Sequence, residues 1–152
     1  MSGRWVARTP SGDPPSRYYH RVLRTARLGP VMVDSRKVLV IEDDADIRAI
    51  MADMLSSEGY SVVEAADGVE GLERAREQLP DVILLDLMMP RMDGWAFREA
   101  QQADANLADI PVVVVSAAMS DRLHAVPAAA HLHKPFDVDE LLGIVGRCAS
   151  RA

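Results

Sequence analysis

Five short apolar runs recur along the chain, and each has the composition of a buried strand. Three of them are continuous and rich in valine, isoleucine and leucine, as central strands covered on both faces are: 38–41, 82–85 and 112–115. The runs 61–65 and 131–133 predict two further short strands. The pattern therefore predicts a five-stranded sheet.

Between these runs, apolar residues return at helical spacing. The positions i, i+3, i+4, i+7 and i+8 of one predicted helix share a face, and they are Ile47, Ile50, Met51, Met54 and Leu55. A second helix is predicted from Val69 through Leu72 and Ala75 to Leu79, before Pro80. A third covers about 95–103. The last begins near Asp137, with Glu140 three residues later as in a capping box.

Strands that alternate with helices predict an α/β fold with right-handed crossovers. The sheet is then parallel and doubly wound, with helices on both faces. In such sheets, ligands bind at the carboxyl ends of the strands, where the strand order reverses. Residues that directly follow or end a strand are therefore the first candidates for a site.

Composition places the chain among globular proteins with one domain. It has 152 residues, of which 49% are hydrophobic and 26% charged. No apolar run approaches the roughly 20 residues that cross a bilayer, so we expect no membrane span. The single cysteine, Cys148, cannot form an internal disulfide, which is typical of a reducing compartment. We expect a cytoplasmic protein.

The net charge of −6 is unevenly distributed. Residues 1–31 hold six arginines and one acid, a net charge of +5, so the remainder carries 11 basic and 22 acidic residues, a net of −11. We interpret 1–35 as a flexible basic extension or as a mis-assigned start upstream of Met32, with a functional basic arm as the third reading. An acidic domain over 36–152 is not expected to bind nucleic acid through its overall field.

Polar residues that could carry chemistry stand at the strand ends. Glu42 and Asp43 follow the first strand, Asp86 and Ser116 follow the third and fourth, and Lys134 follows the fifth. Three acids are suited to a divalent metal. Other polar residues have simpler readings. Asp44 is expected to cap a helix rather than to bind the metal, and His131 and His133 lack a third ligand nearby.

Four segments together resemble the receiver domain of bacterial response regulators. They are 38–44 (VLVIEDD), 86–94 (DLMMPRMDG), Ser116-Ala117 and Lys134-Pro135-Phe136, each preceded by or including a predicted strand. The resemblance covers about 37–148 and implies the flavodoxin-like strand order 2-1-3-4-5.

The resemblance also implies a chemistry. Asp86 would accept a phosphoryl group from a histidine kinase in a reaction that requires Mg²⁺. The metal would be held by Glu42, Asp43, Asp86 and the backbone carbonyl of Met88. Lys134 and Ser116 would contact phosphoryl oxygens, as ammonium and hydroxyl donors can.

Three features depart from the family pattern. Only 17 residues separate Ser116 from Lys134, which predicts a short or irregular fourth helix. His131 stands where many receivers have an aromatic switch residue, and histidine can gain charge near neutral pH. Met88 has no group to orient water, so we expect slow autodephosphorylation.

We therefore expect a stand-alone response regulator of a phosphorelay, with Ser116 and His131 as its switch. Its partners would be a sensor histidine kinase or phosphotransfer protein and a separate protein target. The alternative is a receiver-fold domain that binds proteins without phosphorylation. An enzyme such as an aspartyl-phosphate phosphatase is disfavoured, because Met88 stands where such an enzyme has its second acid. A nucleotide-binding protein is also disfavoured, because no phosphate-binding Gly-x-x-x-x-Gly-Lys-Ser/Thr loop occurs.

Overall fold

A five-stranded parallel sheet forms the centre of the molecule. The structure is a computed structural model that describes residues 36–89, 91–117 and 127–149. The strand order is β2-β1-β3-β4-β5, and every pairing is parallel. The strands are β1 (Lys37–Ile41), β2 (Ser61–Ala65), β3 (Val82–Asp86), β4 (Val112–Ser116) and β5 (Ala130–His133). This confirms the predicted sheet and its order.

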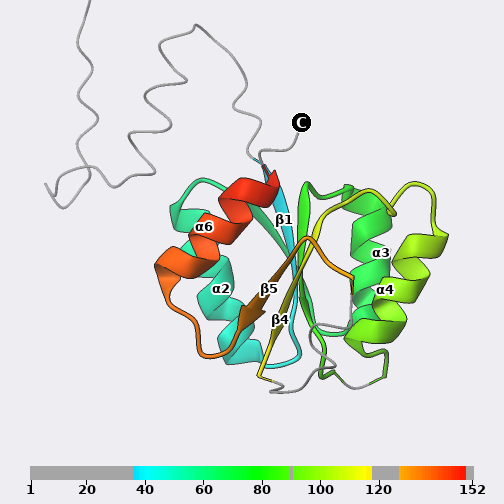
Figure 1. The fold of residues 1–152 in the computed structure, drawn as a ribbon, viewed down its shortest axis with the longest axis horizontal. Coiled ribbons are helices and arrows are strands. Elements are labelled where there is room, and N and C mark those ends of the chain that lie inside the picture. The colour runs from blue at the N-terminus through cyan, green and yellow to red at the C-terminus, as the bar shows by residue number, and fades with distance from the viewer. Residues whose placement is uncertain (1–35, 90, 118–126, 150–152) are drawn as a thin grey trace, which may run out of the picture.

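Helices cover both faces of the sheet, as predicted for a doubly wound fold. They are α2 (Ala45–Ser57), α3 (Gly68–Gln78), α4 (Gly94–Ala103) and α6 (Val138–Ala149). Helices α2 and α6 lie on one face, and α3 and α4 lie on the other (Figure 1). None of the described helices is long and apolar enough to span a membrane.

Two predictions concern parts of the chain outside the described residues. One is the basic extension over 1–35. The other is the short or irregular helix expected between β4 and β5, where 118–126 fall outside the description.

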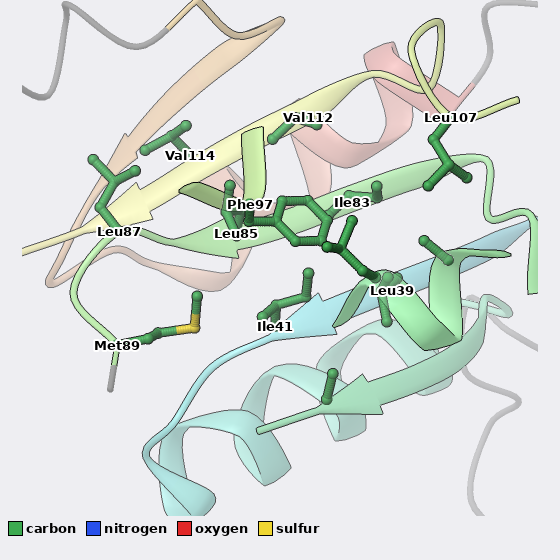
Figure 2. Close-up of a cluster of buried hydrophobic side chains, with 13 residues drawn as sticks. Leu39, Ile41, Ile83, Leu85, Leu87, Met89, Phe97, Leu107, Val112 and Val114 are labelled. Atoms are coloured by element: carbon green, nitrogen blue, oxygen red, sulfur yellow. The ribbon is translucent and has the colours of Figure 1, made fainter. Parts of the chain in front are cut away.

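The sheet separates two hydrophobic cores. On the α3 and α4 face, the fully buried Phe97 packs over β1 and β3, beside Leu39 and Ile83 (Figure 2). On the opposite face, β1, β3, β4 and β5 pack against α2 and α6 through residues such as Leu55 and Val145. Strands that contribute side chains to both cores must be apolar on both faces, which explains the continuous apolar runs of β1, β3 and β4.

Helix α2 is rotated relative to the face predicted from the sequence. Its buried residues are Met51, Ala52 and Leu55, whereas Ile50 is 53% exposed. Arg48 stands three residues before Met51 and four before Ala52, so it lies on the same, inward face of the helix in its first turn. The prediction for Ile50 was wrong because the apolar pattern does not reveal that a polar residue occupies this face.

The apolar residues that predicted helix α3 are not all buried. Leu72 and Ala75 are buried, but Val69 is 40% and Leu79 58% exposed. The helix instead packs through Gly71, where a Cβ atom would lie 2.6 Å from Ile41 Cδ1. A glycine in the packed face brings the helix axis close to the sheet and leaves the larger flanking side chains outside.

Candidate functional site

The predicted site residues lie at one edge of the sheet. Glu42 directly follows β1, Asp86 ends β3, Ser116 ends β4 and Lys134 directly follows β5. Because all strands are parallel, these positions are brought to the same carboxyl edge. The strand order reverses between β1 and β3, so Glu42 and Asp86 flank the point where sites of this fold form.

Three carboxylates converge at this edge. Glu42, Asp43 and Asp86 each present an oxygen atom, and these atoms lie within 4.8 Å of one another. Glu42 is 2% and Asp86 5% exposed, whereas Asp43 is exposed. The cluster therefore has two buried members and one member open to solvent, through which a ligand can enter.

Lys134 supplies positive charge to this cluster. Its Nζ lies 2.8 Å from Glu42 Oε2 and 3.7 Å from Asp86 Oδ2. The ammonium therefore donates to Glu42 and approaches Asp86 more loosely. One cation beside three acids leaves the site with an excess of negative charge.

The acidity of Asp86 reflects this environment. The pKa of Asp86 is raised to about 7, chiefly by burial and also by the nearby charge of Glu42, while the Met88 N–H and Lys134 oppose the shift. A carboxyl group with this pKa resists ionisation beside a second buried acid. A divalent cation between the carboxylates would favour the ionised form.

The segment after Asp86 is held at both ends. The Met88 N–H donates to Asp86 Oδ1 at 3.1 Å, and the Met88 side chain is 62% exposed. At the start of α4, a Cβ on Gly94 would lie 2.7 Å from Leu87 Cα, so only glycine permits this approach. The Gly94 N–H donates to the Leu87 carbonyl at 3.1 Å.

An ion pair also ties this segment to α3. Arg91 donates to the buried Asp67, which caps α3 by accepting from the Glu70 N–H at 2.9 Å. The Glu70 N–H and the Arg91 guanidinium hold the pKa of Asp67 below its ordinary value. The spacing of apolar residues gave no indication of this contact, because the partners are 24 residues apart.

The two proposed switch residues lie on neighbouring strands. Ser116 is fully buried and stands opposite His133, and the Lys134 N–H donates to the Ser116 carbonyl at 3.0 Å. His131 is partly buried on β5, opposite Val114. Lys134 and Ser116 are thus connected through the backbone as well as through the site.

Asp44 is a helix cap, as predicted. Its Oδ1 accepts from the Asp46 N–H at 2.9 Å and from the Ile47 N–H at 3.1 Å. Its backbone N–H donates to Glu42 Oε1 at 3.3 Å, so the residue that caps α2 also binds the side chain of Glu42.

The donor set fits a hard divalent cation. Its members are carboxylate oxygens, and they lie close enough to share one ion. Buried acids that would otherwise repel one another are a favourable environment for such an ion. Among the residues that the structure describes, Glu42, Asp43 and Asp86 form the one group of at least three His, Cys, Asp or Glu that could hold a metal.

Arg48 is a candidate that the sequence did not suggest. Its Nη1 donates to the backbone carbonyl of Glu42 at 2.7 Å, and its Nε lies 3.4 Å from Glu64 Oε1. The sequence did hold one signal for Arg48. A cation in the first turn of a helix is unfavourable beside the helix dipole, so its presence there indicates that it has another role.

A protein-family comparison agrees with this geometry. Residues 38–146 match the model of the response regulator receiver domain. Among curated proteins, the chain is 37% identical over 113 residues to the DNA-binding dual master transcriptional regulator RpaA of Synechocystis, covering 72% of this chain and 47% of RpaA. It is 38% identical over 121 residues to the transcriptional regulatory protein PdtaR of Mycobacterium tuberculosis, covering 76% and 58%. The chain thus spans about half the length of the curated relatives it matches.

Solved structures show the same fold. The chemotaxis protein CheY4 of Vibrio cholerae has a TM-score of 0.70 and 33% identity, covering 75% of this chain and 98% of CheY4. The receiver domain of the sensor histidine kinase PA1611 of Pseudomonas aeruginosa, described with a magnesium ion coordinated in its active-site cleft, has a TM-score of 0.71 and 29% identity, covering 76% and 98%. With its fold, its acidic edge and its match over most of the described residues, the chain belongs to the response regulator receiver domain family.

Proposed function

We propose that this receiver domain accepts a phosphoryl group on Asp86 and signals through a change of its protein-binding surface. The donor is a phosphohistidine on a sensor histidine kinase or phosphotransfer protein. The observation that carries the proposal is the convergence of Glu42, Asp43, Asp86 and Lys134 at the carboxyl edge of the sheet.

In this reaction, Asp86 is the nucleophile. A bond forms between an Asp86 carboxylate oxygen and phosphorus, the bond between phosphorus and the histidine nitrogen breaks, and that nitrogen leaves with the bonding electrons. The Met88 N–H, 3.1 Å from Asp86 Oδ1, orients the carboxylate. The Lys134 ammonium lies close enough to contact the incoming phosphoryl oxygens.

The proposed cofactor is Mg²⁺, held by Glu42, Asp43, Asp86 and the backbone carbonyl of Met88. Bound there, it supplies positive charge that offsets the repulsion between a phosphoryl group and three acids. The PA1611 receiver domain, with its coordinated magnesium, supports this choice of metal.

The proposed readout uses Ser116 and His131. After phosphorylation, the Ser116 hydroxyl would hydrogen-bond a phosphoryl oxygen and His131 would move on the adjacent strand. We expect the response to beryllofluoride, a phosphoryl mimic, to differ between about pH 6 and pH 8 because histidine can gain charge in this range. Equal chemical-shift changes at the two pH values would contradict the pH-dependence of this switch.

We further propose that residues 36–152 form the receiver domain and that 1–35 are a basic extension outside it. The downstream partner is a protein in the cytoplasm, since the acidic domain is unsuited to nucleic acid.

The test is labelling with acetyl phosphate and Mg²⁺. Wild-type protein should form an acyl phosphate that hydroxylamine cleaves, and Asp86→Ala should not. Asp53→Ala, which removes an exposed acid of α2, is the matched control and should label normally. Labelling that persists in Asp86→Ala would refute the assignment. No labelling of the wild-type protein would favour the phosphorylation-independent interaction domain.

A further inference from the structure

Every polar group of Glu42 is engaged in the structure. Its N–H donates to the Ala65 carbonyl at 3.1 Å, and its side chain accepts from the Asp44 N–H at 3.3 Å and from Lys134 Nζ at 2.8 Å. Its carbonyl accepts from Arg48 Nη1 at 2.7 Å. The first three partners belong to the sheet, the helix cap and the site, whereas Arg48 is a long side chain that reaches back from α2.

Arg48 is itself fixed at a second point. Its Nε lies 3.4 Å from Glu64 Oε1 on β2, and its side chain is 20% exposed. The guanidinium therefore spans from the edge strand β2 to the end of β1. Because the planar guanidinium of Arg48 is held by Glu64, it can fix the position of the Glu42 carbonyl to which it donates.

We propose that Arg48 is a positioning residue for the metal site, acting through the Glu42 carbonyl to hold Glu42 and Asp43 in the orientation that binds Mg²⁺. This inference rests on the proposed function. The Glu42 carbonyl lies on the peptide that joins the two acids, so its direction fixes that peptide plane. Rotation of this plane would turn the Asp43 backbone away from the cluster.

The sign of the effect separates this role from simple electrostatics. Arg48 is a cation near three acids, and Coulomb's law alone says that removing it strengthens the binding of another cation. A positioning role predicts the opposite, because the loss of an outer hydrogen-bond partner weakens metal binding, typically by tenfold or more.

The principal variant is Arg48→Met, which retains an unbranched apolar stem and a good helix former but removes every donor. The experiment titrates the full-length protein with Mg²⁺ and follows backbone amide chemical shifts, with urea unfolding measured alongside. We expect Arg48→Met to bind Mg²⁺ about tenfold more weakly. Arg48→Lys, which can still donate to the carbonyl, should recover part of this loss.

Arg74→Met is the matched control. Arg74 is an α3 arginine whose ion pairs with Glu70 and Glu77 are exposed, so its removal changes the net charge equally without touching the site. Its Mg²⁺ affinity should equal or slightly exceed that of the wild type. If Arg48→Met binds Mg²⁺ as tightly as Arg74→Met does, the positioning role is refuted, whether or not the Arg48→Met variant is less stable in urea.

Three further outcomes are decisive. If Arg48→Met does not fold, Glu64→Gln takes its place, with Glu77→Gln, which removes an equal charge from α3, as its control. Loss of the anchoring charge should weaken Mg²⁺ binding about twofold relative to this control, and equal affinity of the two variants would overturn the proposal. If the wild-type protein itself binds no Mg²⁺, the proposed function fails rather than the role of Arg48 alone. Binding that is lost in Asp43→Asn but unchanged in Arg48→Met supports the function and rejects the inference.

Discussion

Asp86→Asn should stabilise the metal-free protein, and the gain should grow with pH. The side chain is 5% exposed, and burial raises its pKa from 3.8 to about 7. Asparagine retains an oxygen that can accept from the Met88 N–H but carries no charge. Substitution therefore removes the cost of ionising a buried carboxyl beside Glu42.

The direction follows from proton linkage. The pKa is higher in the folded state, so the folded protein binds the proton more tightly than the unfolded chain does. The stabilising contribution is complete below about pH 4 and is lost as the pH rises through about 7. One pKa unit corresponds to about 1.4 kcal/mol, so the full loss is about 4 kcal/mol, and more than half of it falls between pH 5 and pH 8.

Urea unfolding in a chelator, followed by circular dichroism, measures this effect. The free energy of unfolding of Asp86→Asn minus that of the wild type should be about 2 to 3 kcal/mol larger at pH 8 than at pH 5. Taking the difference removes contributions from other titrating groups. Asp53→Asn should show no such change. A difference that stays constant with pH, within about 0.5 kcal/mol, would refute the argument.

Magnesium should reduce the stability advantage of Asp86→Asn over the wild type. A ligand that binds only the folded state stabilises it by mass action, so saturating Mg²⁺ at pH 8 should stabilise the wild type more than Asp86→Asn. Equal stabilisation of both proteins would show that Asp86 is not a ligand.

Three other substitutions test separate parts of the structure. Lys134→Gln removes the internal partner of Glu42, so Mg²⁺ affinity in calorimetry should rise about tenfold while acetyl phosphate labelling falls; weaker Mg²⁺ binding would contradict this. Gln101→Leu leaves two carbonyls, of Leu107 and Ile110, without the buried amide that binds them at 2.8 and 3.0 Å, and should lower the free energy of unfolding by about 3 kcal/mol in urea; a loss below about 1 kcal/mol would refute this role. Met88→Asn places an amide at an exposed position beside Asp86, where it can orient water, so release of phosphate from the phosphorylated protein should accelerate about tenfold; a wild-type lifetime of seconds would contradict slow autodephosphorylation.

The sequence predicts the sheet well because its central strands are apolar on both faces. The run from Val82 to Leu85 contributes alternate side chains to the two cores, so every one of its positions is apolar. The faces of the helices are less determined. Ile50 and Val69 belong to the apolar positions that predicted these helices, yet both are exposed, because neighbouring positions hold an arginine that binds the Glu42 carbonyl and a glycine that packs against Ile41, which the hydrophobic period does not register.

The same distinction applies to the site. Residues that end strands are brought together by the topology, so Glu42, Asp86 and Lys134 could be grouped from the sequence before any distance was known. Arg48 could not, because its position depends on the rotation of α2 about its axis. That rotation buries Met51 and Leu55 and turns Arg48 toward the Glu42 carbonyl, so the proposed positioning role would link the packing of α2 to the orientation of the acids. A substitution that changes the packed face of α2 should therefore alter metal binding even where it touches no ligand.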